Sequence, residues 1–421
     1  MTEPSRHLLP VLLAVLGMAC EPAESSCLSG ESTACDCPSG ARGAQSCEDG
    51  RFGACRCDSD AGQPMDGGRP SAGDAAAPND ASALVDARVA SDAGPPVEGV
   101  LFEEDFDDLP DWTSGDEGAP LPGDFYSMRA DSAFAMSDGF PGGREAIEIL
   151  EGNVEMARGG AGKSLVMWRD SNGPDWYWGS DSMLTVYFPE GHDELYLRFW
   201  IRFDPAWTPD GESGMTKLFR FSSWDPDDGP LYQAFPHGAN GPILIWDYQH
   251  NDYGTRNLLA FRGHPQETNY RMTDPPMINL PRRGNTSMNF DDDIRDLDGD
   301  GVDDNVVDQL RNLITGEPVS GTVSHEELYG DVWHEVEFHI RMNSGPGVYD
   351  GVLQQWLDGQ LIFRNVTLPW RGTESTGDPL WNVVSFGGNS HFHAYPESER
   401  RQEWRAIDDI LIRDSLPPER R

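Results

Sequence analysis

The chain is 421 residues long, and 72 Asp and Glu residues against 31 Lys and Arg residues give it a formal net charge of -41. Such an excess of negative charge repels phosphate backbones, so we predict that nucleic acid is not a partner. No internal apolar run reaches the roughly 20 residues that a membrane-spanning helix needs. The length suits one large domain with attachments, or two domains.

Residues 1–19 are predicted to be a lipoprotein signal peptide. A weakly basic start precedes the short apolar stretch Leu8–Leu16, and the small residues Gly17 and Ala19 stand three and one positions before Cys20. This order suits signal peptidase, and a Cys directly after the cut suits lipidation. The segment resembles a bacterial lipoprotein signal, which implies export and a lipid anchor at Cys20 in the outer membrane or at the cell surface. An ordinary secretory cut before Cys20 is the alternative.

Residues 20–57 form a small Cys-rich module. If Cys20 carries lipid, six of the seven Cys remain, in a C-x7-C-x-C unit that recurs after 20 residues: Cys27, Cys35, Cys37, Cys47, Cys55 and Cys57. An even number of Cys in an exported, loop-rich segment favours disulfides, whose pairing the sequence leaves open. A zinc site is the alternative, although the C-x2-C spacing is missing. The module resembles the N-terminal module of many surface lipoproteins of myxobacteria.

Residues 58–98 are rich in Ala, Asp, Gly, Pro and Ser and contain hardly any large apolar side chain. Such a segment cannot bury enough apolar surface to fold, so we predict a disordered acidic linker. Its root-mean-square span is on the order of 35 Å, which is the reach that a membrane tether needs.

Residues 99–418 are predicted to form an all-β domain, an antiparallel β-jelly roll or sandwich. Alternating and β-branched runs separated by Gly, Pro and Asp turns favour strands, and long helical periodicity is nearly absent. In chain order, the predicted strands are 101–106, 146–150, 164–168, 183–188, 194–203, 216–222, 243–248, 257–261, 333–342, 352–357, 361–366, 382–386 and 406–413. Asp358-Gly359 is the expected tight turn of a hairpin.

The predicted strand 194–203 has two distinct faces. One face is plainly apolar, and the other combines aromatic and guanidinium groups, which can stack on sugar rings and bind carboxylates. The predicted strand 333–342 repeats this pattern with a charged face. The substrate-binding candidates are Tyr196, Arg198, Trp200, Arg202, His339 and Arg341. A merely solvated face is the alternative for both strands.

Residues from about 281 to 330 are interpreted as an insertion that holds a calcium loop. The run D-x-D-x-D-G-x-x-D supplies four carboxylates, with a Gly for the sharp turn, from Asp296, Asp298, Asp300 and Asp304. Its end departs from an EF-hand, because Val307 stands at the twelfth position. The loop looks more like the short calcium loops of thrombospondin-type and dockerin repeats, and a solvated acidic loop is the alternative.

The second half of the domain carries a wider resemblance. The motifs are Trp333-His334-Glu335-Val336, Asn343, Asp350-Gly351, Trp356-Leu357-Asp358-Gly359, Phe386-Gly387-Gly388 and Ile407-Asp408-Asp409-Ile410. Together they resemble the concanavalin-A-like jelly rolls of bacterial polysaccharide lyases, closest to polysaccharide lyase family fourteen and related alginate-lyase-like proteins. The resemblance implies a polysaccharide held on a concave sheet, and a structural calcium held by Glu104 and Asp408.

In such lyases a basic or amide side chain neutralises the uronate carboxylate, while a Tyr or His removes the neighbouring proton. The stretch 214–218 resembles the family's Gly-x-Lys-Leu segment, which implies a place in the catalytic groove for Lys217. The family's following Arg strand and Tyr-x-Tyr pair are not recognisable. The catalytic candidates are Lys217, Arg220, Tyr248, His250, Tyr253 and Arg256. Tyr248 and His250 stand two apart, so a strand through both would aim them at one face.

The leading hypothesis is a lipid-anchored surface protein, expected to be a monomer, that binds an acidic polysaccharide and cleaves it by β-elimination. A retaining glycoside hydrolase on this fold would need a Glu-x-Asp-x-Glu strand, which the sequence lacks. Two alternatives stay open. One is a lectin-like carbohydrate-binding protein without chemistry, and the other is a structural surface module.

Overall fold

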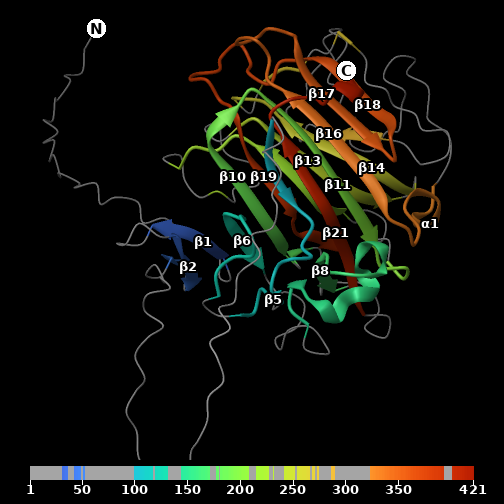
Figure 1. Cartoon of the computed structure of the whole chain (residues 1–421). Coiled ribbons are helices and arrows are strands. Elements are labelled where there is room, and N and C mark those ends of the chain that lie inside the picture. Colours follow the sequence, from blue (N-terminus) through green and yellow to red (C-terminus); the bar gives the residue numbers. More distant parts are fainter. Residues whose placement is uncertain are drawn as a thin grey trace, which may run out of the picture.

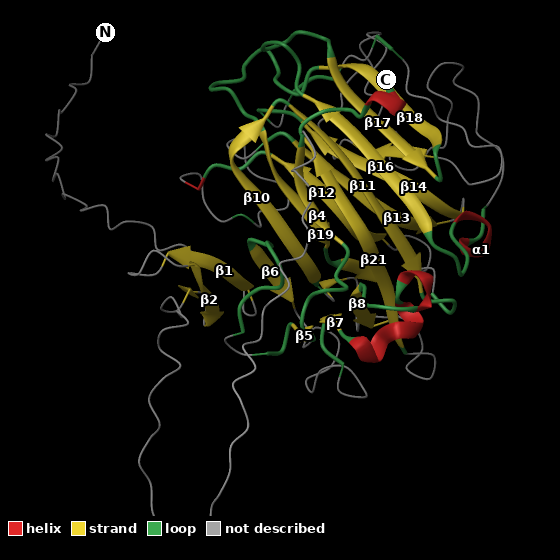
Figure 2. Ribbon diagram, viewed as in Figure 1, coloured by secondary structure: helices red, strands yellow, loops and turns green. Residues whose placement is uncertain are grey.

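The computed structural model describes the chain over a set of separate ranges. These are residues 31–36, 42–48, 51–52, 99–116, 119–130, 144–170, 177–179, 181–207, 215–226, 231, 241–251, 254–265, 268–270, 273–274, 286–289, 323–392 and 401–421. Among these residues, strands dominate and form two facing sheets, as in a β-sandwich with a jelly-roll arrangement (Figures 1 and 2). The predicted all-β fold class is therefore confirmed.

The larger sheet contains 12 described strands, and its main path runs β15-β14-β13-β12-β19-β10-β6-β1-β2-β3. The short strands β9 and β20 extend it beside β12. Pairing is antiparallel except between β14 and β15. The strands are β1 (Glu31–Asp36), β2 (Arg42–Glu48), β3 (Arg51–Phe52), β6 (Ser127–Ala130), β9 (Tyr177–Gly179), β10 (Ser182–His192), β12 (Met215–Ser222), β13 (Ile243–Asn251), β14 (Gly254–Arg262), β15 (Thr286–Asn289), β19 (Trp381–Gly387) and β20 (Ser390–Phe392).

The smaller sheet contains 9 described strands in the order β18-β17-β16-β11-β21-β8-β7-β5, with β4 paired to β21. The strands are β4 (Val100–Glu104), β5 (Trp112–Thr113), β7 (Ile147–Ile149), β8 (Leu165–Asp170), β11 (Glu194–Phe203), β16 (His334–Arg341), β17 (Gly351–Leu357), β18 (Gln360–Leu368) and β21 (Gln402–Arg413). The described helices are short: α1 (His325–Leu328) and the 3-10 turns Glu151–Met156, Arg158–Gly160 and Pro418–Arg420. No helix in the described ranges is long and apolar enough to cross a membrane.

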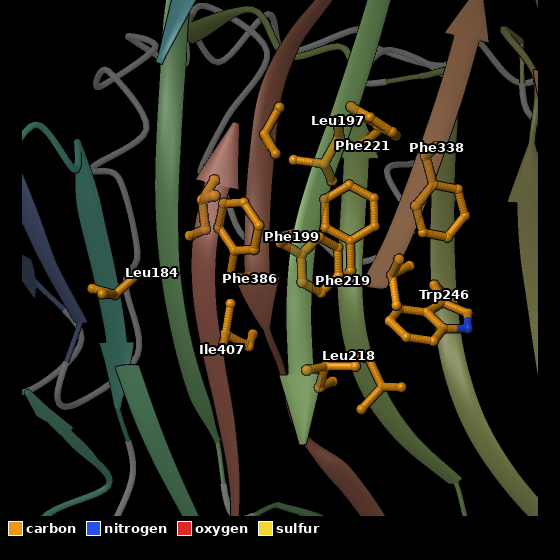
Figure 3. Packing of buried hydrophobic residues seen from close by; sticks show 14 of the residues in the cluster. Leu184, Leu197, Phe199, Leu218, Phe219, Phe221, Trp246, Phe338, Phe386 and Ile407 are labelled. Atoms are coloured by element: carbon orange, nitrogen blue, oxygen red, sulfur yellow. The ribbon is translucent and has the colours of Figure 1, made fainter. Parts of the chain in front are cut away.

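The hydrophobic core lies between the two sheets and is rich in aromatic rings (Figure 3). Phe219 of β12 stacks on Phe338 of β16, with ring centroids 5.2 Å apart, and Phe199 of β11 meets Phe386 of β19 at 5.6 Å. The apolar face predicted for strand 194–203 is confirmed, because all five of its apolar side chains are fully buried. This contact between the sheets leaves each sheet one outward-facing side.

All thirteen strands expected from periodicity are present, with ends that differ by a few residues. The hairpin turn is also confirmed: Asp358 and Gly359 both have positive φ, 49° and 73°, and connect β17 to β18. Positive φ at both central residues is the conformation for which Asp-Gly pairs are favoured. The strands that periodicity missed are β1 and β2 near the N-terminus and the shorter strands β3, β5, β6, β9, β15 and β20.

Strands β1, β2 and β3 extend the larger sheet at one edge. β1 and β2 form an antiparallel pair, and β1 pairs with β6 through Glu31 and Arg129 at one end and Thr33 and Ser127 at the other (Figure 1). Only the backbone of these strands is described, so the side chains of Cys35 and Cys47 are outside the description. Cys20, Cys27, Cys37, Cys55 and Cys57, together with the signal peptide and the linker, lie outside the described residues. Their lipid and disulfide assignments stay predictions.

Candidate functional site

The larger sheet turns a polar surface away from the core, and we call this side the outer face. Across four neighbouring strands, Ser127 of β6 pairs with Thr185 of β10, Thr185 with Ser385 of β19, and Ser385 with Arg220 of β12. The hydroxyls of Thr185 and Ser385 are hydrogen bonded at 2.9 Å. The outer face thus has a row of hydrogen-bonding groups that runs across the strands and ends at a guanidinium group.

A β-bulge in β12 places two of the predicted catalytic residues on the outer face. The pairing of β12 with β13 shifts register between Lys217 and Phe219, and both Leu218 and Phe219 lie in the core. Strict alternation would have put Lys217 and Phe219 on the same face. Because one extra residue is accommodated there, Lys217 and Arg220 both point outward although they are three positions apart.

Lys217 is held in place from two sides. Its Nζ donates a hydrogen bond to Asn389 Oδ1 at 2.8 Å, and its backbone N donates to the Asn389 carbonyl at 3.0 Å. Gly388 has φ +147°, and a Cβ at this position would lie 2.7 Å from the Cβ of Lys217. The Gly387-Gly388 pair therefore permits the close approach that joins Asn389 to Lys217.

Burial strongly perturbs the Lys217 amine. The side chain is 6% exposed, and desolvation, followed by the nearby Arg220, lowers its pKa to about 8, while Asp247 and Asp181 act in the opposite direction. Asp181 itself forms an ion pair with Arg129 of β6. A lysine with such a pKa is largely protonated at neutral pH but exchanges its proton readily near pH 8, as a general base requires.

The neighbouring strands β13 and β14 continue the outer face with more charged and amide groups. Asp247 of β13 pairs with Lys217, and Gln249 pairs with Arg256 of β14. All of these side chains are buried, with Arg256 only 1% exposed. Buried titratable groups with perturbed pKa values, gathered on one face, are typical of functional sites. Lys217, Arg220, Asp247, Gln249 and Arg256 therefore make up our candidate site, and we call them the cationic cluster.

The placement predicted for Tyr248 is corrected by the structure. Tyr248 is 0% exposed and packs in the core against Phe203, Trp207 and Tyr329. It belongs to the inner face of β13, because it alternates with the outward-facing Asp247 and Gln249. A substrate on the outer face is therefore separated from Tyr248 by the sheet itself.

His250 shares the inner side of β13 with Tyr248, as their spacing predicted. Both side chains reach the hydroxyl of Thr255, His250 Nδ1 at 3.0 Å and Tyr248 Oη at 3.5 Å. Burial, followed by the nearby Arg256, lowers the pKa of His250. The assignment of His250 to the same surface as Lys217 is thus corrected too. Tyr253 lies outside the described residues, and its role stays a prediction.

The predicted substrate-binding set lies on the opposite side of the sandwich from Lys217. All six residues belong to β11 and β16 of the smaller sheet: Tyr196, Arg198, Trp200, Arg202, His339 and Arg341. The substrate-binding candidates and Lys217 therefore do not share one face of the protein. The physical reason is topological, since β11 pairs with β16 and β21, whereas β12 pairs with β13 and β19.

Several members of this set are engaged in contacts that stabilise the fold. Tyr196 Oη donates to Glu337 Oε2 at 2.6 Å, and the same carboxylate is paired with Arg420. Burial, followed by the hydrogen bond to Glu337, raises the pKa of Tyr196. His339 lies 3.0 Å from Glu194 through its Nε2. Such closed pairs leave these groups less available to a ligand.

Three of the remaining members also contact other parts of the protein. The Arg158 guanidinium lies 4.0 Å from the ring centroid of Trp200, and Arg202 is paired with Asp331 at 2.6 Å. Arg341 is exposed and reaches the Asp350 carbonyl at 3.3 Å. These contacts account for Tyr196, Trp200 and Arg202 of β11, whereas the Nε of Arg198 is buried with no hydrogen-bond partner among the described residues.

The predicted metal ligands fall into two groups. Asp296, Asp298, Asp300 and Asp304 lie outside the described residues, so the calcium loop stays a prediction. Glu104 and Asp408 are described: Glu104 Oε1 accepts from the Phe106 N–H at 2.8 Å, and Asp408 accepts from Ser164 Oγ. Burial raises the pKa of Asp408 to about 6. No group of three or more His, Cys, Asp or Glu side chains in the described ranges is placed to hold a metal, so we assign no step to calcium.

A pocket of about 720 Å³ opens at one end of the outer face. It is bordered by Tyr187 of β10, by Ser223 and Trp224 just beyond β12, and by Asn382 of β19. These border residues are half-buried except for Asn382, whereas the cationic cluster is buried. Exposure along the outer face therefore increases toward the pocket. Periodicity alone gave no signal for it, because loop residues complete its wall.

Neither a protein-family model nor a curated protein matches this sequence. Among solved structures, alginate lyase Aly36B is 13% identical with a TM-score of 0.36, covering 64% of this chain and 83% of that one. The marine PL-14 alginate lyase from Aplysia kurodai is 12% identical with a TM-score of 0.35, covering 65% and 87%. The Emp46p carbohydrate recognition domain is 9% identical with a TM-score of 0.29, covering 60% and 89%. The function of this chain therefore has to be inferred from its own residues.

Proposed function

We propose that this protein binds an acidic, uronate-containing polysaccharide on the outer face of the larger sheet. The observation that carries the proposal is the cationic cluster, in which Lys217 and Arg220 of β12 and Arg256 of β14 lie on one face beside a row of hydroxyls. Guanidinium groups bind carboxylates through paired hydrogen bonds, and Ser and Thr hydroxyls both donate to and accept from sugar hydroxyls.

The dimensions of the outer face suit a polymer. The six strands β6, β10, β19, β12, β13 and β14 are consecutive neighbours. With strands about 4.8 Å apart they span roughly 24 Å, which accommodates several linked sugar rings. Because the face is most exposed at the pocket, we place the entrance for the polymer there, with the cationic cluster deeper along the face.

A second candidate function is cleavage of the bound polymer by β-elimination, and the environment of Lys217 favours it. A pKa near 8 leaves a substantial fraction of neutral amine in mildly alkaline solution. Arg220 on the same strand can neutralise the uronate carboxylate, which makes the proton on the adjacent carbon more acidic and stabilises the enediolate. Asn389 orients the amine by accepting one of its hydrogen bonds.

The elimination needs no reactant other than the polymer and water. The neutral Lys217 amine takes the proton from C5 of the uronate, and the electron pair forms the C4–C5 double bond as the C4–oxygen bond breaks. The departing oxygen receives a proton from water, and the ammonium later returns its proton to solvent. The products are a new chain end and an unsaturated uronate, which absorbs ultraviolet light.

The test uses the full chain with alginate, pectate, glucuronan, hyaluronan and heparin, each followed by ultraviolet absorbance and by calorimetric binding. A rise in absorbance with one polymer would support elimination if the rate of that rise falls about 10²- to 10⁴-fold in Lys217→Ala. The matched control is Arg341→Ala, which removes an exposed cation from the opposite sheet and should leave binding and turnover unchanged. The expected pH profile rises through about pH 8 as the amine loses its proton.

The same assay separates binding from catalysis. Saturable binding of one acidic polymer without any absorbance change would reject elimination and leave the lectin-like function. Absence of binding to every polymer in the panel, with the protein folded, would reject the binding proposal itself and favour the structural surface module.

A further inference from the structure

The pocket at the end of the outer face differs in chemistry from the cationic cluster. Its described lining includes Tyr187, Trp224 and Asn382 together with the acids Glu190, Asp225 and Asp378. Lys and Arg are absent from that described lining, and His264, hydrogen bonded to Ser375 Oγ at 2.7 Å, is the basic side chain it contains. The volume of about 720 Å³ lies within the range of small-molecule sites, so one or two sugar rings fit.

One wall of the pocket is aromatic. The ring centroids of Tyr187 and Trp224 are 5.2 Å apart at an interplanar angle of 68°, and Tyr126 packs behind Tyr187 at 4.9 Å. All three side chains are half-buried, so part of each ring remains accessible. Large aromatic side chains that keep one exposed side give apolar contact area to the C–H face of a sugar ring.

The aromatic wall is preorganised by the adjacent strand. Asn382 Oδ1 accepts from the Trp224 N–H at 2.8 Å, and Asn382 Nδ2 donates to the Trp224 carbonyl at 2.7 Å. This two-point contact fixes the backbone that carries the indole before any ligand arrives. A fixed wall reduces the conformational entropy that binding would otherwise cost.

The electrostatic character of the pocket disfavours an anion. Burial raises the pKa of Tyr187, and Tyr126, Asp225 and Glu190 raise it further, as expected where the local field is negative. Asp378 is ion paired with Arg371, whereas Glu190 lies 3.7 Å from His192 and is largely exposed. Carboxylates accept hydrogen bonds from sugar hydroxyls but repel a uronate carboxylate.

We propose that this pocket is a binding site for an uncharged sugar residue. Tyr187 and Trp224 stack on the ring, while Asp225 and Glu190 accept hydrogen bonds from its hydroxyls. The site is separate from the cationic cluster: Arg220 is in register through Ser385 with Thr185, which is two residues from Tyr187 on β10, so Arg220 lies roughly 7 Å along the strand and two strands across from Tyr187. If both sites are used by one polymer, that polymer combines neutral and acidic sugars.

The test titrates the full chain with neutral tetrasaccharides of glucose, mannose, galactose and xylose, by calorimetry and by Trp fluorescence. Trp224→Ala should weaken the binding of the preferred sugar about tenfold or more, while Trp224→Phe, which keeps an aromatic face, should retain most of it. Arg341→Ala on the opposite sheet is the matched control. Thermal melts show that each variant is folded.

Three results would overturn the proposal. The first is the absence of saturable binding of any neutral tetrasaccharide. The second is a uronate tetrasaccharide that binds more tightly than every neutral one and whose affinity also falls in Trp224→Ala. The third is an amino sugar or quaternary ammonium compound that binds more tightly than every neutral tetrasaccharide. Because neutral sugars carry no carboxylate, their titration is independent of the cationic cluster. Either proposal can therefore fail while the other stands.

Discussion

Removing the amine of Lys217 should stabilise the folded protein at neutral pH. Lys217 has a pKa of about 8 in the folded state against 10.5 for the ordinary side chain, because burial disfavours its charge. A shift of this size lowers the free energy of unfolding by about 3 kcal/mol at any pH at which the amine is protonated in both the folded and the unfolded state. Lys217→Met keeps much of the side-chain volume and removes the charge.

The net gain is smaller than 3 kcal/mol, since the substitution also removes the hydrogen bond from Nζ to Asn389 Oδ1. Loss of that bond costs about 1–2 kcal/mol, so we expect Lys217→Met to be more stable than the native chain by about 1–2 kcal/mol at pH 7. Stabilisation by loss of a functional group is common where a site holds an unfavourable charge.

The pH dependence makes this expectation specific. Between about pH 8 and 10.5 the unfolded state binds more protons at Lys217 than the folded state does, so the stability of the native chain rises with pH over this window. Lys217→Met lacks this rise, and its advantage should disappear by about pH 10. Denaturant unfolding at several pH values measures the difference, and a constant difference from pH 6 to pH 10 would refute the reasoning.

Four further predictions concern residues outside the cationic cluster. Tyr248→Phe should leave polysaccharide binding and any turnover unchanged, because Tyr248 lies in the core, and a strong loss of turnover in a folded variant would contradict that placement. Tyr196→Phe should lower the free energy of unfolding by about 1–3 kcal/mol through the lost hydrogen bond to Glu337, without affecting binding; unchanged stability by denaturant titration would count against it. Asp298→Ala should weaken calcium binding in calorimetric titration, and equal binding by both proteins would remove the predicted loop. Cys20→Ser should abolish labelling by radioactive palmitate and release the chain from membranes, whereas continued labelling would exclude Cys20 as the anchor.

The strands could be predicted because their apolar periodicity is strong, but the direction in which a side chain points was harder to predict. In β13 the sequence Ile243-Leu244-Ile245-Trp246 is apolar at every position, so the first half of the strand does not show which parity faces the core. The second half does show which residues face the core. Asp247 and Gln249, at odd-numbered positions, are polar, and Tyr248 stands between them at an even-numbered position. Tyr248 and His250 share the even parity that faces the core, so reactive side chains alone do not indicate which face of the strand is exposed.

The bulge in β12 and the assignment of strands to sheets could not be obtained from local patterns. A bulge depends on how two paired strands fit together, here β12 and β13, and the other neighbour of β12, β19, is more than 150 residues away in the sequence. Likewise, nothing within β11 indicates that it belongs to the sheet opposite Lys217. The Gly387-Gly388 pair was recognised as a motif, but its physical reason, the contact with Lys217, became visible only in three dimensions.

The two outward faces show how similar residue types acquire different roles. On the smaller sheet, Tyr196 donates a hydrogen bond to Glu337 and Arg202 forms an ion pair with Asp331, so these groups have partners within the fold. On the larger sheet, Arg220 lies close enough to Lys217 on the same strand to depress its pKa, while Asp247 and Asp181 act in the opposite direction. Perturbed pKa values of this kind are typical of functional sites, which supports the proposed binding of an acidic ligand.

A net charge of -41 does not oppose this conclusion as strongly as its size suggests. At physiological ionic strength, exposed charges are screened beyond about 8 Å, so acids elsewhere on the chain act weakly on a ligand in the cationic cluster. Buried cations are screened much less, and their attraction for a carboxylate is stronger in a low-dielectric environment. Under the proposed function, the distant acids mainly slow the approach of an acidic polymer, while the cationic cluster would determine how tightly one of its uronate rings is held. A pocket at the entrance that binds neutral sugar would offset the slow approach, because it can hold the polymer through residues that the acids do not repel.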